Sequence, residues 1–197
     1  LVGGIATLPL PMRHLGQPQL QRAADRLGVQ IGRQPAPHQH SKAVAGAHPS
    51  QRLHKALVQP LFSAGATLLG ICLGMQFLFD ESEEMGRHAG LGLLAGRVVR
   101  FPAGLVHDGR PLKVPHVGWN EIEPVGAPPL LDGIGPAAHT YFVHSFYCAP
   151  ADVADVLATA DYGGRFAAIV GRGRVFGYQF HPEKSQRVGL RLLRNYI

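Results

Sequence analysis

The residue whose neighbours best suit it to chemistry is Cys72, at the centre of the sequence Gly-Ile-Cys-Leu-Gly at residues 70–74. Glycines two residues to either side of a nucleophile are typical of a tight strand-to-helix turn with strained backbone angles. Amides at the start of the following helix would favour the thiolate and lower the thiol pKa. The Leu73 N–H could hold the oxyanion of an acyl transfer. The pattern predicts a nucleophile, although a core cysteine beside packing glycines would read the same.

A candidate base follows about a hundred residues later, where a predicted strand at 175–180 ends in His-Pro-Glu. Alternate residues of an extended segment point to the same side, and Pro182 keeps its predecessor extended. Glu183 could therefore orient the His181 ring while that ring exchanges a proton with Cys72. Taken alone, the pair could be an ordinary surface contact. Together with the glycine-flanked turn around Cys72, which we call the elbow, the His181–Glu183 pair predicts a Cys-His-Glu triad.

The elements that must position these residues read as an α/β domain over residues 66–197. The apolar run at 66–71 predicts a buried strand, and 73–84 predicts a helix. β-Branched and aromatic residues between Gly and Pro breaks predict the remaining strands. These lie at 96–101, 141–147, 156–160, 167–170 and 175–180, and a final helix is expected at 187–196.

Residues 1–65 are less regular. A helix is predicted at 19–27, where Gly28 provides a stop signal, but residues 30–65 follow neither a helical nor a strand period. The chain of 197 residues suits one hydrophobic core, and no internal repeat interrupts it. We therefore expect a single domain over 1–197 whose first 65 residues are atypical.

Composition excludes several classes of protein. No apolar run reaches the roughly 18–20 residues of a membrane span, and no leader-like segment begins the chain. Two cysteines form no disulfide framework, so a cytoplasmic location is expected. The net charge of +6 comes from residues 1–60, which hold seven basic residues and one acid. Because these basic residues are scattered and no aromatic residues lie among them, nucleic-acid binding is not expected.

No metal or cofactor is expected either. His38 and His40 have the spacing of metal ligands, but no third ligand accompanies them. No Gly-rich phosphate loop followed by Lys and Ser or Thr is present, so the chain is not expected to activate a substrate with ATP.

The two motifs together resemble the signatures of class I (triad) glutamine amidotransferases: Gly-Ile-Cys-Leu-Gly-Met-Gln at 70–76 and Gly-Tyr-Gln-Phe-His-Pro-Glu at 177–183. Segments at 90–101, 114–120, 141–147 and 158–164 resemble the glutaminase subunits of imidazole glycerol phosphate synthases. The resemblance implies an α/β fold with an open, mostly parallel central sheet flanked by helices and with additional antiparallel strands in the C-terminal half.

The resemblance also implies an activity. Cys72 would attack the glutamine carboxamide and form a γ-glutamyl thioester. His181, oriented by Glu183, would protonate the departing ammonia and then activate water. The ammonia would pass to a (β/α)₈-barrel cyclase subunit in a heterodimer, which forms imidazole glycerol phosphate and aminoimidazole carboxamide ribotide (AICAR) in histidine biosynthesis. Glutamine is the expected substrate.

The resemblance also implies roles for other residues that match the family's motifs. The residues expected to bind glutamine are Gln76, Glu84, Ser145 and Phe146. The residues expected to face the cyclase are His116, Val117, Trp119, Asn120, Tyr141 and Lys184. More ordinary roles stay open, since Gln76 and Glu84 could be solvent-facing helix residues and Trp119 a core aromatic. Cys148 is expected to be structural.

One departure concerns the oxyanion. The family carries Pro-Gly-x-Gly-x-Phe before the nucleophile, and this motif supplies a second hydrogen-bond donor to the oxyanion. The most similar segment here is residues 44–48, in which Gly46 is the candidate donor. Losing one such donor costs about 10²–10³ in rate. Two alternatives therefore remain: a catalytically weak homologue acting mainly as a binding partner of the cyclase, or the glutaminase of another synthase (anthranilate, carbamoyl phosphate). Met75 and residues 114–120 argue against the latter.

Overall fold

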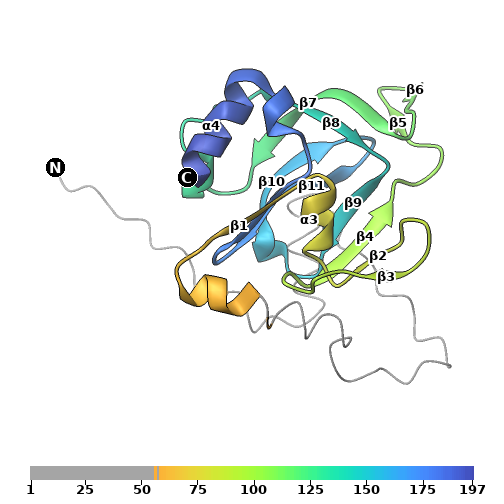
Figure 1. Ribbon diagram of the computed structural model, residues 1–197. Coiled ribbons are helices and arrows are strands. Elements are labelled where there is room, and N and C mark those ends of the chain that lie inside the picture. Colours follow the sequence, from red (N-terminus) through yellow and green to blue (C-terminus); the bar gives the residue numbers. More distant parts are fainter. Residues whose placement is uncertain (1–55, 57) are drawn as a thin grey trace.

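The computed structural model describes residue 56 and residues 58–197 (Figure 1). The predicted helix at 19–27 and the candidate oxyanion donor Gly46 lie outside these residues. Residues 58–63 are helical and lead into the first strand of the central sheet.

The central sheet has six strands in the order β1-β12-β11-β10-β7-β8. Strand β1 runs parallel to β12, with Leu68 opposite Val175 and Ile71 opposite Tyr178. Every other pairing within this sheet is antiparallel. The strands are β1 (Leu68–Ile71), β7 (His116–Pro124), β8 (Ala138–His144), β10 (Val156–Asp161), β11 (Arg165–Arg172) and β12 (Val175–Tyr178).

A second sheet has four strands in the order β3-β2-β4-β9, and β5 pairs with β6 in a separate hairpin. These strands are β2 (Glu81–Ser82), β3 (His88–Ala89), β4 (Gly96–Arg100), β5 (Val106–His107), β6 (Arg110–Pro111) and β9 (Phe146–Pro150). Three short 3-10 turns cover Pro129–Leu131, Val153–Asp155 and Pro182–Lys184.

The α/β class is confirmed, and so are the antiparallel strands expected in the C-terminal half. Across the described residues, however, the sheets are mixed rather than mostly parallel, with parallel pairs only at β1–β12 and β2–β4. The reason lies in the connections. A parallel pair needs a crossover of a dozen or more residues, whereas a short turn makes a hairpin. Strands β11 and β12, for example, are joined at Gly173 and Arg174 alone.

Two further expectations differ from the structure. Helix α3 covers only Leu73–Phe77 rather than 73–84, because Leu78 and Phe79 are both buried and the chain then pairs as β2. The single strand expected at 141–147 is two strands, β8 and β9, separated at Ser145. The break lets β8 pair with β7 and β9 pair with β4. The final helix, α4 (Gln186–Tyr196), is confirmed.

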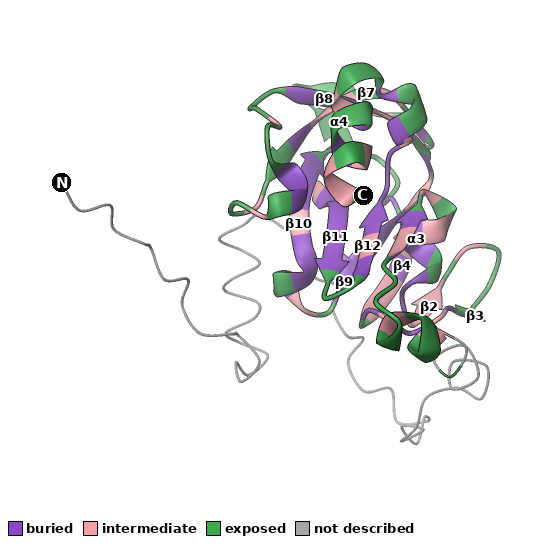
Figure 2. Cartoon of the chain, turned by 60° about the vertical axis from the view of Figure 1, so that its left-hand side comes forward, coloured by how far each residue is buried: buried purple, intermediate pink, exposed green. Residues whose placement is uncertain are grey.

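Two hydrophobic clusters cover opposite faces of the central sheet. On β11, Phe166 and Ala168 belong to one cluster and Ala167 to the other, as alternation along a strand requires. Helix α4 covers the first face through Leu192, and α3 covers the second through Met75. Figure 2 shows the resulting buried strands β10, β11 and β12 between the helices. Within the described range no helix is both long and apolar enough to cross a bilayer.

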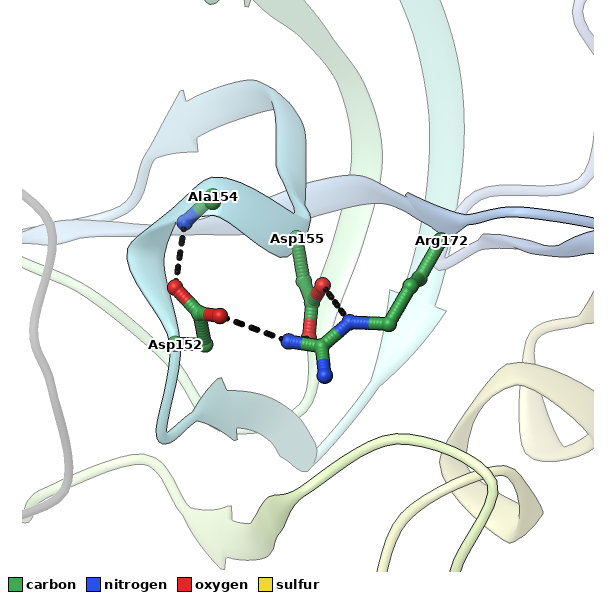
Figure 3. Close-up of polar contacts among 4 residues, drawn as sticks. All are labelled: Asp152, Ala154, Asp155 and Arg172. Atoms are coloured by element: carbon green, nitrogen blue, oxygen red, sulfur yellow. Dashed lines mark hydrogen bonds and ion pairs between the residues drawn. The ribbon is translucent and has the colours of Figure 1, made fainter. Parts of the chain in front are cut away.

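An ion-pair network fixes the chain between β9 and β10 (Figure 3). The Arg172 guanidinium on β11 donates to the carboxylates of Asp155 and Asp152, at 2.8 and 2.7 Å from Nη2. The other oxygen of Asp152 accepts the Ala154 N–H at 3.0 Å and closes the 3-10 turn. Because the Asp155 residue is 2% exposed, Arg172 is its necessary counter-charge.

Candidate active site

The candidate nucleophile stands on a strained turn between β1 and α3. Cys72 has φ 51° and ψ −109°, a conformation that L-residues adopt only when the surrounding structure enforces it. Its N–H donates to the Tyr178 carbonyl at 2.7 Å, which continues the parallel β1–β12 pairing by one residue. Gly177 on β12 makes room for the following helix, because a Cβ there would lie 2.6 Å from Met75 Cγ.

The candidate base and its orienting carboxylate lie where β12 ends. His181 Nδ1 is 2.7 Å from Glu183 Oε1. Burial alone would raise the pKa of Glu183, but hydrogen bonds from its own backbone N–H and from His181 lower it below its ordinary value. The ionised carboxylate therefore accepts the Nδ1–H of His181, a tautomer in which Nε2 of the ring is the proton acceptor.

The parallel pairing of β1 and β12 brings the two motifs together, since both follow the carboxyl ends of adjacent strands. Gln179 Nε2 lies 4.0 Å from Cys72 Sγ. The charges of Glu183 and Lys184 both act on the Cys72 thiol. Sequence reasoning missed Gln179, although it lies within the same motif as His181, two residues before it.

The Cys72 thiol differs from expectation in one respect. Burial raises its pKa above the ordinary value, and this outweighs the Leu73 N–H hydrogen bond that lowers it. Glu183 and Glu84 add negative charge that raises the pKa further, while Lys184 lowers it. The helix that was expected to favour the thiolate is only five residues long, so its dipole is small. The resting thiol is thus protonated and needs a base.

A hollow opens beside α3, next to the turn that carries Cys72. Glu84 is the carboxylate among its lining residues, and the Ser82 hydroxyl accepts the Glu84 N–H at 3.2 Å. The lining consists of Leu73, Gln76, Phe77, Ser82, Glu84, His88, Ala89 and Gly90. Glu84 reaches the hollow from the segment after β2, not from a helix as the sequence suggested. No group of three or more His, Cys, Asp or Glu side chains in the described part of the chain could hold a metal.

Gln76 lies between this hollow and the interior. Its side chain is buried and donates to the Phe146 carbonyl at 3.0 Å and to Gln179 Oε1 at 3.3 Å. Two of the expected residues, Gln76 and Phe146, are therefore joined by a hydrogen bond, while the Ser145 carbonyl accepts the Phe101 N–H at 3.0 Å. The carbonyls of Ser145 and Phe146 both have partners within the protein.

An exposed strip of side chains on β7 and β8 adjoins the base. Trp119 is 47% exposed and lies opposite Tyr141, with ring centroids 6.0 Å apart. Lys184 Nζ lies 5.7 Å from the Tyr141 ring, and the Tyr141 carbonyl accepts the His181 N–H at 2.9 Å. Val117, 56% exposed, continues the strip along β7. We call Val117, Trp119, Tyr141 and Lys184 the β7–β8 strip.

Two residues expected on this surface belong elsewhere. His116 alternates with Val117 on β7 and points into the core, where it is 3% exposed and stacks on Tyr162. Asn120 points the same way and donates to the Asp161 carbonyl at 2.7 Å. The expected contact of His116 with a partner is therefore replaced by a position in the core, because successive side chains of a strand point to opposite faces.

Comparisons with known proteins identify the family of this chain. The model of the class-I glutamine amidotransferase family matches residues 45–197. The HisH subunit of imidazole glycerol phosphate synthase from Syntrophotalea carbinolica is 51% identical over 142 residues, covering 71% of this chain and 69% of the relative. The HisH subunit from Geobacillus thermodenitrificans is 57% identical over 133 residues, covering 68% of this chain and 62% of the relative.

The chain thus spans about two thirds of the length of the curated relatives it matches. A crystal structure described as a glutamine amidotransferase aligns with 73% of this chain and 68% of its own, at 20% identity and a TM-score of 0.49. The sequence relationship is far stronger than this structural one. On that relationship, the chain belongs to the class-I glutamine amidotransferases and, among them, to the HisH subunits of imidazole glycerol phosphate synthase.

Proposed function

We propose that this chain is the glutaminase subunit of an imidazole glycerol phosphate synthase. It hydrolyses glutamine to glutamate and ammonia, and a cyclase subunit uses the ammonia to form imidazole glycerol phosphate and AICAR in histidine biosynthesis. The observation that supports this proposal is the parallel pairing of β1 with β12, because Cys72 follows the end of one strand and the His181–Glu183 pair follows the end of the other.

The chemistry follows from the state of each group. His181 Nε2 takes the proton of Cys72 as the sulfur attacks the carboxamide carbon, because the raised thiol pKa leaves little thiolate beforehand. The Leu73 N–H holds the developing oxyanion, with Gly46 proposed as a second donor. The imidazolium then protonates the leaving ammonia, and the neutral ring activates the water that hydrolyses the γ-glutamyl thioester.

Substrate selection is assigned to the hollow beside α3. Glu84 supplies the negative charge for the α-ammonium group of glutamine. The Ser82 hydroxyl accepts the Glu84 N–H and so holds the Glu84 backbone in place. Gln76 supports this wall through Phe146. Backbone groups of Ser145 and Phe146 complete the site in this proposal.

The β7–β8 strip is the proposed docking surface for the cyclase. Its exposed aromatic and aliphatic side chains suit the centre of an interface, and it adjoins the base through Tyr141. Docking there would keep the ammonia out of bulk water, where it becomes unreactive ammonium. We infer that residues 1–197 act as one domain of a cytoplasmic heterodimer.

The activity is tested by glutamate release from glutamine, with and without the cognate cyclase. The chain should turn over faster with the cyclase, and Cys72→Ala should abolish release while the two subunits still associate. Cys148→Ala is the matched control, since Cys148 is a buried core residue on β9 with no proposed role in the chemistry and should retain turnover. Glutamate release by Cys72→Ala would overturn the mechanism.

The raised thiol pKa gives one competing function some support: a homologue that is catalytically weak and acts mainly as a binding partner of the cyclase. The same assay separates the two. Association without glutamate release, at any concentration of cyclase, would favour the binding role.

The docking surface is tested with matched apolar truncations. Trp119→Ala should weaken association with the cyclase by about 2 kcal/mol or more if the indole is a buried anchor of the interface. Leu61→Ala is the control, because Leu61 is 58% exposed on the helical segment at the other end of β1 (Figure 1). Equal affinities of the two variants would move the docking surface elsewhere.

A further inference from the structure

Two buried histidines outside the triad lie side by side beneath the β7–β8 hairpin. His116 on β7 is 3% exposed and His144 on β8 is 6% exposed, and their ring centroids are 5.3 Å apart at an interplanar angle of 65°. Among the described residues, Nδ1 of His116 and Nε2 of His144 have no hydrogen-bond partner. Each ring therefore carries one satisfied and one unsatisfied nitrogen.

The tautomer of His144 follows from its satisfied nitrogen. Nδ1 lies 2.7 Å from the Phe146 carbonyl oxygen, which can only accept a hydrogen bond. The proton is therefore on Nδ1. Burial lowers the pKa of His144 to about 4, although the Phe146 carbonyl opposes this shift, so the ring is neutral at pH 7. Its Nε2 is left as a bare acceptor.

The tautomer of His116 follows from Asn120. The Asn120 amide has a fixed orientation, because its oxygen accepts the Glu121 N–H at 2.8 Å and its nitrogen donates to the Asp161 carbonyl at 2.7 Å. That nitrogen also lies 3.4 Å from His116 Nε2 and donates to it. Burial lowers the pKa of His116 to about 3, so the neutral ring carries its one proton on Nδ1. This N–H is an unpaired donor.

The two unsatisfied atoms are thus complementary, one donor and one acceptor in neighbouring rings. Buried polar groups are rarely left unpaired, because their desolvation is then uncompensated. Stacking on Tyr162 at 3.9 Å and Phe142 at 4.9 Å holds the His116 ring edge toward its neighbour. A hydrogen bond between the two rings, either direct or through one bridging water, would satisfy both atoms.

We propose that the Nδ1–H of His116 is hydrogen-bonded to Nε2 of His144, directly or through one water, and that the two histidines are positioning residues for the glutamine site. The link completes a chain of hydrogen bonds from Asn120 through both rings to the Phe146 carbonyl. Gln76 donates to the same carbonyl and lines the hollow beside α3. A shift of His144 therefore moves an acceptor on which Gln76 depends.

Strand β7 also connects the His116–His144 hydrogen bond to the β7–β8 strip, and this second inference rests on the proposed function. Val117 and Trp119 lie on the opposite face of β7 from His116. A cyclase pressing on the β7–β8 strip would displace β7 and, through His116, alter the wall of the glutamine site. The histidine pair is thus a route by which docking can raise glutamine turnover.

The link is tested spectroscopically on the full chain labelled with ¹⁵N-histidine. At pH 7, both His116 and His144 should be neutral and protonated on Nδ1, and the His116 Nδ1 proton should exchange slowly with solvent. A scalar coupling across the hydrogen bond identifies a direct link, and a cross-peak to water identifies the bridged one. The Nε2–H tautomer, or an imidazolium, at either residue would overturn the proposal whatever the enzyme's activity.

The positioning role is tested with two isosteric variants. An asparagine amide overlays Nδ1 of histidine and a glutamine amide overlays Nε2, so His116→Asn keeps the donor to His144 and His116→Gln loses it. The ratio of glutamine turnover with and without the cyclase should fall roughly fivefold or more in His116→Gln. It should stay within about twofold of the unsubstituted chain in His116→Asn.

A double substitution separates the link from simple core packing. His144→Asn keeps the donor to Phe146 but removes the Nε2 acceptor, so adding it to His116→Gln should cause little further loss in the turnover ratio. Additive losses, or equal losses in both His116 variants, would show that the rings act only as core side chains. If the unsubstituted chain releases no glutamate at all, the proposed function fails while the tautomers still decide the link.

Discussion

Gly70 and Gly74 approach so closely that a Cβ added to Gly70 would lie 2.5 Å from the carbonyl carbon and oxygen of Gly74. This contact folds the chain back on itself around Cys72 and holds its strained backbone angles. Gly70 must therefore be glycine because any side chain there would collide with the backbone of Gly74. Gly74 itself contributes only its backbone to this contact.

The two glycines should respond differently to alanine. Gly70→Ala should reduce the free energy of unfolding by about 1–3 kcal/mol and abolish glutamine turnover, because the overlap falls on backbone that cannot rotate away. A Cβ on Gly74 would meet no described atom within 4 Å apart from its chain neighbours and the backbone of its own helix, so Gly74→Ala should leave stability within about 0.5 kcal/mol. Chemical denaturation of both variants measures the difference. A stable, active Gly70→Ala chain would contradict the model of the elbow.

Alkylation of Cys72 should report the raised thiol pKa. Because the thiolate is the reactive form and burial raises the pKa above 9.0, the iodoacetamide rate should rise about tenfold per pH unit between pH 7 and 9. A plateau below pH 8 would indicate a preformed thiolate instead. Cys72→Ser gives the background, since Cys148 is buried and its pKa is also raised by burial.

The network of Figure 3 predicts an asymmetric loss of stability. Arg172→Met would leave the buried Asp155 carboxylate without its counter-charge, so we expect a loss of about 1–3 kcal/mol in the free energy of unfolding. Solvent weakens the ion pair because the Arg172 side chain is 44% exposed, which keeps the loss within this range. Asp152→Asn keeps the buried pair and should cost less. The two variants would have equal stability if Asp155 did not need the guanidinium.

The buried histidines predict instability in acid. Their folded pKa values, about 3 for His116 and about 4 for His144, lie below the ordinary value of 6.5. Below pH 6.5 the unfolded chain binds protons that the folded chain does not, so stability falls as the pH falls from 6.5 toward 4.

Each histidine contributes up to about 1.4 kcal/mol per pH unit to this slope. Denaturant unfolding between pH 4 and 7 measures it. His144→Gln should flatten the slope by one histidine's share, and His139→Gln, an exposed site on the same strand, should leave it unchanged. An unchanged slope in His144→Gln would show that His144 titrates normally.

Residue types and spacing by themselves predicted a glycine-flanked nucleophile at Cys72 and the His181–Glu183 pair, and the resemblance of these motifs predicted the family. These depend on local rules: a tight turn needs glycine, and a strand ending fixes which side chains share a face. The same rules located most strands and the final helix, because β-branched runs and helical periods are local patterns. They did not predict β7, whose segment with Val117 and Trp119 was recognised only through its resemblance to the family.

Tertiary structure alone decided the rest. The shortness of α3 depends on Leu78 and Phe79 entering the core, and the division at Ser145 depends on two strands joining different sheets. The direction of the thiol pKa shift depends on how deeply Cys72 is buried, a property that neighbours in sequence do not fix. The alternation of β7 sends His116 inward beside His144, a residue 28 positions away in sequence. Burial and long-range pairing are properties of the folded chain, so the elbow around Cys72 could be recognised from its motif, whereas the environment that sets its reactivity could not.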